Sequence, residues 1–591
     1  MGFNELLADC GEFGYFQKLL AFGFLMPAVI SVSCTYWTQI FILLIPPHRC
    51  KLYPDDNDYL NAANLSLTSK DECHLYQNRD LKPSEIVPCP YGIVYDYSLY
   101  FPTFASEHDW VCENSWKMYL VHTCYWIGVV LGSFSLGFLS DKYGRKRAYQ
   151  VAVMLTLIFD VATFFAQEQI IFVVVRFASA FFGRNLATMS FVLAVEYTGP
   201  NKRRLNTFMW SFPYAVICTA LPWIAYYLHH WKYLLIISWI PMIITVITSF
   251  FLTESASWLI TQGRLEEAAQ CVHRMARING KNMDRDYIIE KLKEEQNQCK
   301  EVKSQGNSKP STNTGENRCS SKTDGGETGN LEKKDEIPLF NIILQLMRSP
   351  NLRKKLIFFS VIWFIACMCY NGNNLESSNL PFNMYIVYSV GGLTEMLGIF
   401  FCLFTIDKFG RRWTNAGCFI LGGVLGIIST SIDTKEVIIV LALVIRSCYS
   451  AAFDITFTFT NESFPTIIRG RAISFVRTFG GLGSTVSPFV VRLSEKEALL
   501  PLVVFGMLAV ASGVLTIFLP ETAKQHLPHE MEDGENFGKT QPFWFCPFSE
   551  KPLEEEMEYQ RKTHFCISDI SEDGKDNNTQ VKCISLKKLE K

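Results

Sequence analysis

Seven side chains inside long apolar runs could bind a small charged molecule. They combine two aromatic rings and an amide with carboxylates and guanidinium groups. The seven are Trp363, Tyr370, Asn371, Glu395, Arg446, Asp454 and Arg477. An ionisable group inside a membrane span is costly and usually faces protein or a water-filled cavity, and aromatic faces attract ammonium groups. The pattern therefore predicts a buried site for a small organic ion.

Each of these charges can also be interpreted as a structural partner. Glu395 could attract a cationic amine or take up a proton, or it could pair with Arg446 or Arg477. Arg446 and Asp454 are eight residues apart, so on a helix they share a face. Asp454 is a candidate source of negative charge, and Arg477 could face a substrate carboxylate. Both signs near one site suggest a zwitterion.

The sequence contains no persuasive catalytic signature. Walker A, HExxH and GxSxG motifs in their required contexts are missing. We therefore expect no enzymatic activity, no cofactor and no metal site. The net charge of −2 provides no basic field for nucleic acid. Without an ATP-binding motif, the available energy sources are a concentration gradient, the membrane potential or a coupled ion, which the sequence does not identify.

Twelve apolar runs, each long enough to cross a bilayer as a helix, position these side chains. They cover about 18–45, 118–139, 148–166, 170–194, 206–228, 233–253, 355–373, 382–406, 413–431, 436–460, 471–492 and 498–519. The run at 355–373 extends into several asparagines, and the run at 471–492 carries Arg477 and several glycines. We predict an all-α membrane protein with six-helix bundles at 18–253 and 355–519.

A hexapeptide occurs once in each half, as DKYGRK at 141–146 and DKFGRR at 407–412. A Glu/Arg pair follows each copy at nearly the same distance, which indicates a duplicated unit. The candidate gating residues are Asp141, Gly144, Arg145, Glu196 and Arg203 in the first half, and Asp407, Gly410, Arg411, Glu462 and Arg469 in the second. Arg176 lies inside the run at 170–194 and is either a gating residue or a structural partner. Two such bundles could rock about a central site, with each hexapeptide network acting as a latch; alternatively, these charges only enforce topology.

Orientation follows from the basic loops, which all fall on one side if twelve helices alternate. That side should be cytoplasmic. The N-terminus 1–17, the loop 254–354 and the tail 520–591 then lie inside, and the segment 46–117 lies outside. The inner loop is polar, with a helix expected over RLEEAAQCVHRMARI and disorder in its middle, 296–337.

The outer segment has features of an extracellular loop. It holds the four cysteines Cys50, Cys73, Cys89 and Cys112, and a glycosylation sequon at Asn64. An even number of cysteines in an oxidising compartment predicts two disulfides, and three pairings are possible.

Several motifs resemble a known family. GFLSDKYGRKR and IDKFGRR look like the paired loops of the major facilitator superfamily. GEFGYFQKLL, HDWVCENSWK, ESASWLITQGRLEEA, NESFPTIIRG and LPET narrow the resemblance to organic cation/anion/carnitine transporters, over about residues 5–525. One departure matters: cation carriers often have aspartate, and many anion or carnitine carriers arginine, where this chain has Gly481.

The resemblance implies a multi-pass plasma-membrane carrier with both termini cytoplasmic. We expect it to move small organic cations or zwitterions, such as carnitine-, carcinine- or amine-like molecules, by alternating access. An organic-anion carrier of the same fold and a non-transporting receptor are the alternatives.

Overall fold

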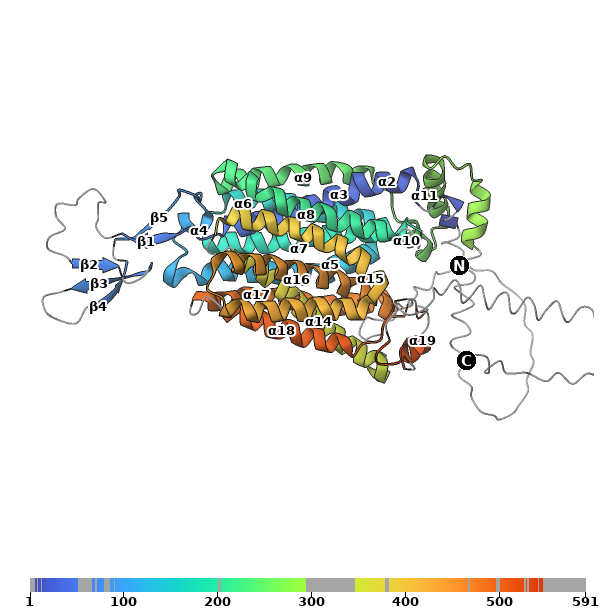
Figure 1. The fold of residues 1–591 in the computed structure, drawn as a ribbon. Coiled ribbons are helices and arrows are strands. Elements are labelled where there is room, and N and C mark those ends of the chain that lie inside the picture. The colour runs from blue at the N-terminus through green and yellow to red at the C-terminus, as the bar shows by residue number, and fades with distance from the viewer. Residues whose placement is uncertain are drawn as a thin grey trace, which may run out of the picture.

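The computed structural model describes most of the chain (Figure 1). Its described residues are 6–7, 9–11, 13–51, 66–69, 72–78, 85–89, 91–199, 203–293, 346–377, 382–465, 468–495, 500–523, 525, 528, 531–539 and 541–545. Asn64, the whole segment 296–337 and most of 520–591 lie outside these residues, as do the side chains of Arg203 and Asp407. Expectations about them stay predictions.

The N-terminal bundle consists of six long helical segments. They are α2 (Tyr15–Leu20) continued through a π-helical turn η1 (Ala21–Leu25) into α3 (Met26–Ile42), then α5 (Trp116–Tyr143), α6 (Arg145–Phe165), α7 (Gln169–Glu196), α8 (Arg203–Leu228) and α9 (Trp231–Phe251). Gly144 has a φ of 102° and separates α5 from α6. Glycine adopts this conformation without strain, so the first hexapeptide is a tight turn between two helices.

The C-terminal bundle repeats this arrangement. Its helices are α14 (Pro350–Glu376), α15 (Met384–Ile428), α16 (Lys435–Ser463), α17 (Arg469–Val491) and α18 (Leu500–Ile517). Gly410 has a φ of 85° and interrupts α15, so this long element comprises two spans. Short 3-10 turns follow two of these helices, η6 (Ser429–Ser431) after α15 and η7 (Arg492–Glu495) after α17. A third 3-10 turn, η3 (Cys112–Asn114), precedes α5 in the N-terminal bundle.

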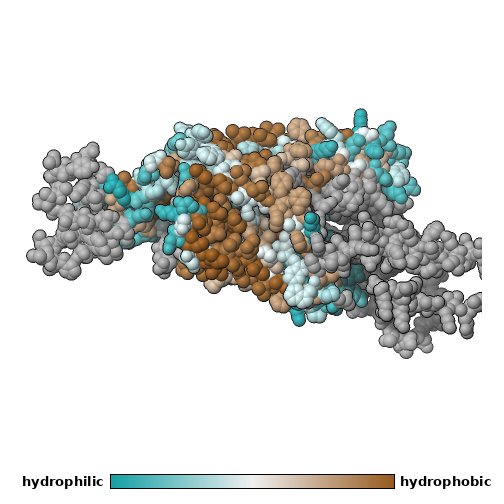
Figure 2. All heavy atoms as spheres, in the orientation of Figure 1, coloured by the Kyte–Doolittle hydropathy of each residue, from teal (hydrophilic) through white to brown (hydrophobic). Residues whose placement is uncertain are grey.

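The twelve-helix prediction is confirmed by these segments. Ten of them are long and apolar enough to cross a membrane. The other two are α14 and α17, which carry the asparagines and the arginine noted in the sequence and still extend over 27 and 23 residues. Figure 2 shows hydrophobic side chains covering the middle of the molecule between hydrophilic ends. A belt of this kind is the surface that lipid covers.

Two pairs of equivalent helices join the bundles, with α5 against α17 and α8 against α15. Close approach depends on glycine at both contacts. A Cβ on Gly481 would lie 2.3 Å from Cγ2 of Val130, and a Cβ on Gly392 would lie 2.4 Å from Oγ1 of Thr219. The departure at Gly481 therefore has a structural reason, because that position has no room for a side chain in this conformation.

Short strands occupy the segment after α3, which the all-α prediction did not include. They are β1 (His48–Cys50), β2 (Ser66–Ser69), β3 (His74–Asn78), β4 (Glu85–Pro88) and β5 (Ile93–Tyr95). β1 pairs with β5, and β2, β3 and β4 form a second antiparallel sheet. A short helix, α4 (Phe104–Glu107), leads back to the bundle. We call this end of the molecule the strand end (Figure 1).

The opposite end carries both hexapeptides, and we call it the basic end. It also carries α10 (Ala256–Thr261), α11 (Leu265–Ile278) and α19 (Met531–Asn536) (Figure 1). α11 confirms the helix expected over RLEEAAQCVHRMARI. Its apolar face packs in the same cluster of buried side chains as Leu6 and Leu7 from the start of the chain.

Candidate functional site

A cluster of polar and aromatic side chains lies where the two bundles meet. We call the following set the central cluster: Tyr36, Trp37, Tyr214, Tyr370, Asn371, Glu395 and Arg446. Two hydrogen bonds in it cross between the bundles. The Tyr36 hydroxyl donates to Oδ1 of Asn371 at 3.0 Å, and the hydroxyls of Tyr370 and Tyr214 lie 3.0 Å apart. The bundles thus meet through polar groups that could exchange partners with a ligand.

Glu395 and Arg446 form a buried ion pair within the central cluster. Nε of Arg446 lies 2.8 Å from Oε1 of Glu395, and both side chains are only 2% exposed. Arg446 also donates to Sγ of Cys218 at 3.0 Å and covers the ring of Trp37. The sequence left two roles open for Glu395, a substrate or proton site and an ion-pair partner. The geometry in this conformation is that of the ion-pair partner, because Arg446 compensates the charge of Glu395.

Tyr370 and Asn371 are anchored by neighbours on four helices, α3, α8, α15 and α17. The Tyr370 hydroxyl also lies 3.3 Å from Oε2 of Glu395. Nδ2 of Asn371 donates to Oγ of Ser484 on α17 at 3.0 Å. Trp363, two turns away on α14, donates from Nε1 to Oγ1 of Thr460 at 2.9 Å. Tyr370 and Asn371 therefore lie beside the other bundle, whereas Trp363 lies against α16 of its own bundle.

Asp454 does not pair with Arg446, although the two share a helix. Its carboxylate makes no ion pair or side-chain hydrogen bond with any of the described residues and lies near enough to Glu395 for their charges to interact. The structure therefore groups these two acids in the C-terminal bundle. Only Glu395 has a guanidinium partner there.

Two arginines contact aromatic rings instead of carboxylates. Arg477 on α17 lies over Trp363, at 5.7 Å from the ring centroid, and over Phe457, at 5.5 Å. Arg184 on α7 lies over Tyr36 at 5.0 Å and over Trp126 at 5.8 Å. Arg477 was predicted from the sequence and Arg184 was not. The basic side chain of Arg184 inside the apolar run 170–194 would have indicated it.

Arg176 belongs to a separate network inside the N-terminal bundle. Its Nη2 donates to Oε1 of Gln39 at 2.7 Å, and its Nη1 lies 3.7 Å from Oδ1 of Asp160. Asp160 in turn accepts a hydrogen bond of 2.5 Å from Ser179. Arg176 is thus placed as a structural partner inside the bundle, away from the hexapeptides. Its partner Asp160 was not predicted from the sequence.

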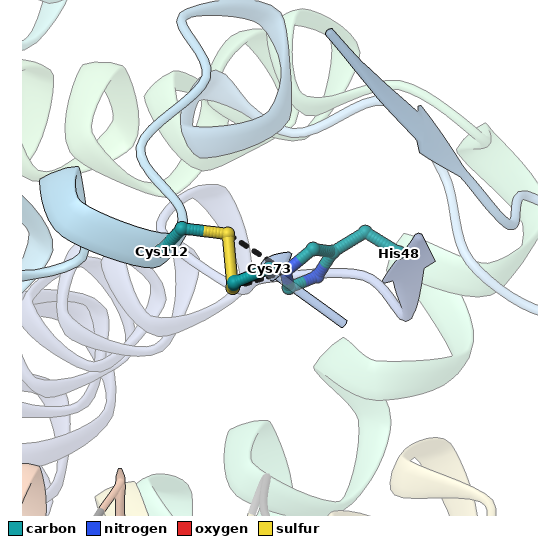
Figure 3. Close-up of side chains that lie close together, drawn as sticks. All are labelled: His48, Cys73 and Cys112. Atoms are coloured by element: carbon teal, nitrogen blue, oxygen red, sulfur yellow. Dashed lines mark hydrogen bonds between the residues drawn. A yellow bond between two sulfur atoms is a disulfide. The ribbon is translucent and has the colours of Figure 1, made fainter. Parts of the chain in front are cut away.

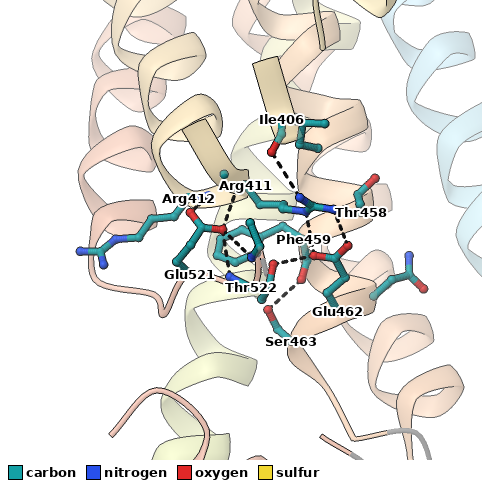
Figure 4. Close-up of polar contacts among 12 residues, drawn as sticks. Ile406, Arg411, Arg412, Thr458, Phe459, Glu462, Ser463, Glu521 and Thr522 are labelled. Carbon is teal, nitrogen blue, oxygen red and sulfur yellow. Dashed lines mark hydrogen bonds and ion pairs between the residues drawn. The ribbon is translucent and has the colours of Figure 1, made fainter. Parts of the chain in front are cut away.

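Each hexapeptide arginine pairs with the predicted glutamate of its own bundle. Nε of Arg145 lies 3.6 Å from Oε1 of Glu196, and Arg145 also pairs with Asp141. Nε of Arg411 lies 2.9 Å from Oε2 of Glu462 (Figure 4). Arg469, by contrast, donates from Nε to the backbone carbonyl of Phe464.

Two further glutamates complete these networks. Glu254 accepts a hydrogen bond from the backbone N–H of Lys146 at 3.1 Å. Glu521 accepts from the backbone N–H groups of Arg411 at 2.9 Å and Arg412 at 3.0 Å (Figure 4). A carboxylate at a helix N-terminus satisfies N–H groups that have no helical partner. Neither glutamate was among the predicted gating residues.

The strand end contains both expected disulfides. They join Cys50 to Cys89 and Cys73 to Cys112, which selects one of the three pairings. Nε2 of His48 lies 3.8 Å from both sulfurs of the second disulfide (Figure 3). These three side chains are close enough together for a metal site, but disulfide sulfurs are not the thiolates that a metal would need.

Comparison with known proteins agrees with this architecture. The Major Facilitator Superfamily model matches residues 113–488 and 381–553. The "Organic cation transporter 1" of Caenorhabditis elegans is 27% identical, over 91% of this chain and 89% of that protein. The "Beta-alanine transporter" of Drosophila melanogaster is 27% identical (90% and 89% covered), and "Solute carrier family 22 member 6" of Rattus norvegicus is 26% identical (90% and 94% covered).

A solved structure supports the fold independently. The inward-open xylose transporter XylE from E. coli superimposes with a TM-score of 0.53 and 14% identity, over 89% of this chain and 99% of XylE. The matched relatives and structures are transporters, and none of those described here is an enzyme. The chain belongs to the Major Facilitator Superfamily.

Proposed function

We propose that this chain carries small organic ions across the plasma membrane by alternating access of its two bundles to the central cluster. The observation that carries the proposal is the pair of hydrogen bonds that cross between the bundles, Tyr36 to Asn371 and Tyr370 to Tyr214. Polar groups at mid-membrane are costly unless they serve a pathway or a partner. A substrate that enters here would replace these contacts.

Contacts between the bundles near the strand end would close access to the central cluster from that side, and we call them the strand-end gate. Nε1 of Trp223 donates to Oγ of Ser389 at 2.9 Å, and Oγ of Ser389 donates to the backbone carbonyl of Thr219 at 3.0 Å. The rings of Tyr226 and Tyr385 meet edge to face at 5.2 Å. All of these contacts join α8 to α15. Opening towards the outside would require them to separate.

The hexapeptide networks would act at the opposite gate. Arg145–Glu196 and Arg411–Glu462 tie neighbouring helices within each bundle, so each bundle can move as a unit. Positive residues at this end predict a cytoplasmic orientation. The alternative, that these charges only set topology, leaves transport rates unchanged when they are neutralised.

Counterflow into proteoliposomes tests the proposed function. Vesicles loaded with an unlabelled probe should accumulate the same labelled probe transiently, for at least one of tetraethylammonium, choline, carnitine, β-alanine or p-aminohippurate. Saturable binding of a probe without exchange would favour a receptor, and folded protein that neither binds nor exchanges any of them would contradict the proposal.

A further inference from the structure

Two arginines in the spans, one from each bundle, have no carboxylate partner among the described residues. Within the same residues, neither Arg184 nor Arg477 makes an ion pair or a hydrogen bond, and both lie over aromatic rings. Both side chains are partly buried, whereas Arg176 and Arg446, also in the spans, are fully buried and have acidic partners. Arg176 lies beside Asp160 and Arg446 pairs with Glu395.

The two unpaired arginines face a common region. Arg184 lies over Tyr36, whose hydroxyl donates to Asn371 of α14. Arg477 lies over Trp363 of the same helix. Both arginines therefore lie beside α14, where their like charges repel each other. Arg184 also interacts with Tyr370 and contacts Tyr36, two members of the central cluster. The region between the arginines therefore borders the central cluster and belongs to both bundles.

Aromatic contacts alone are a poor replacement for the water that a guanidinium group loses on burial. Two such groups that also repel each other form a region of positive potential. The nearby acids do not neutralise it, since Glu395 is engaged by Arg446 and Asp454 lies on the Glu395 side. An anion placed between the arginines would compensate both charges.

We propose that Arg184 and Arg477 together bind a carboxylate group of the transported substrate, which is therefore an organic anion or a carboxylate-bearing zwitterion. This inference rests on the proposed function. The planar guanidinium fork matches a carboxylate in two parallel hydrogen bonds. The rings of Tyr36, Trp126 and Trp363 would then flank the remainder of the substrate. Because the arginines come from different bundles, the substrate would also link the halves that must move together.

The position of Arg477 on α17 is consistent with the way that α17 packs against α5. Gly481, one turn beyond Arg477, lies against Val130 of α5 with no space for a side chain. Residues four apart on a helix lie on the same face. Arg477 therefore presents its charge from the same side of α17, next to the rings of Trp363 and Phe457.

A matched panel of probes tests the inference on the native protein. Carnitine and choline both carry a trimethylammonium group, and only carnitine carries a carboxylate. In proteoliposome counterflow, p-aminohippurate and carnitine should exchange saturably, and choline and tetraethylammonium should not. Exchange of choline or tetraethylammonium without the carboxylates would overturn the inference and leave the proposed function intact. If the folded protein exchanges neither these four probes nor β-alanine, the proposed function and the inference both fall.

Variants then assign the effect to the two arginines. Arg184→Gln and Arg477→Gln should each raise the KM for the carboxylate probes about tenfold or more, because each removes a charge-assisted hydrogen bond. Arg184→Lys and Arg477→Lys keep the charge and should retain part of the affinity for the carboxylate probes. They also test the assignment if a glutamine variant folds poorly. Arg285→Gln, on an exposed site outside the spans, is the matched control and should leave KM unchanged. A KM that is the same in native protein and in both folded glutamine variants would overturn the assignment.

Discussion

Nε of Arg411 lies 2.9 Å from the carboxylate of Glu462, and both residues belong to the C-terminal bundle. The equivalent distance between Arg145 and Glu196 in the N-terminal bundle is 3.6 Å. Both pairs are partly shielded from solvent. The two copies of the hexapeptide therefore hold equivalent helices together with unequal geometry.

Neutralising the C-terminal pair should affect transport more than neutralising its N-terminal equivalent. We expect Glu462→Gln to lower Vmax several-fold with little change in KM, because the pair lies far from the central cluster and biases the movement of the bundles. Glu196→Gln should have a smaller effect, since its ion pair is longer. Initial-rate uptake by both variants checks this prediction, and an equal or larger effect at Glu196 would contradict it.

Gly410 should not tolerate a side chain. Its φ of 85° is unfavourable for alanine, and an added Cβ would lie 2.3 Å from Oε2 of Glu521. We expect Gly410→Ala to destabilise the protein by about 1–3 kcal/mol. Gly417→Ala is the matched control, because a Cβ there meets nothing within 4 Å. Thermal unfolding in detergent should show a lower midpoint for Gly410→Ala than for the native chain and an unchanged midpoint for Gly417→Ala. Equal midpoints in the two variants would refute this explanation of the turn.

Removal of the Glu395 carboxylate should leave Arg446 buried without compensation. Breaking one half of a buried pair typically costs about 3–5 kcal/mol. Glu395→Gln should therefore unfold at a markedly lower temperature, and the double variant Glu395→Gln/Arg446→Gln should regain part of the loss. If Glu395→Gln is as stable as the native chain, the carboxylate is not the structural partner described above.

The segment after α18 should dock in a pH-dependent way. The carboxylate of Glu535 accepts hydrogen bonds from the backbone N–H groups of Asn351 and Leu352 at the start of α14. Partial burial opposes ionisation of Glu535, but these hydrogen bonds and nearby Lys539 outweigh it and lower its pKa. A lowered pKa means that the stabilisation is fully present above the ordinary value of about 4.3 and is lost as the pH falls through the folded-state value.

Hydrogen exchange can follow this docking. Amides of 531–539 should be protected at pH 7, remain protected near pH 5 and lose protection at more acidic pH. In Glu535→Gln, protection should already be reduced at pH 7. Equal protection in the variant and the native chain at pH 7 would show that this carboxylate does not hold the segment.

The sequence predicted the long-range plan better than individual contacts. Twelve apolar runs and the repeated hexapeptide follow from hydropathy and spacing, and the structure confirms the fold that they indicate. Pairing is harder to predict because it depends on tertiary geometry. Glu395 had two possible arginine partners and the structure pairs it with Arg446. Arg184 drew no attention, although its contacts with Tyr36 and Trp126 place it beside the cluster. The strands between 48 and 95 were also missed, since these segments are three to five residues long and carry only weak patterns.

The most direct test of alternating access is a reversible lock across the strand-end gate. Ser389 and Thr219 are neighbours across this gate, with Oγ of Ser389 3.0 Å from the carbonyl oxygen of Thr219. The lock is the oxidised double variant Thr219→Cys/Ser389→Cys, in which the loss of two free thiols verifies that the disulfide has formed. The oxidised double variant should lose counterflow of whichever probe the native protein exchanges and recover it on mild reduction, and both single variants and the native chain should be unaffected by the same treatment. A cross-linked double variant that exchanges probe as fast as the single variants would contradict movement of the two bundles about the central cluster.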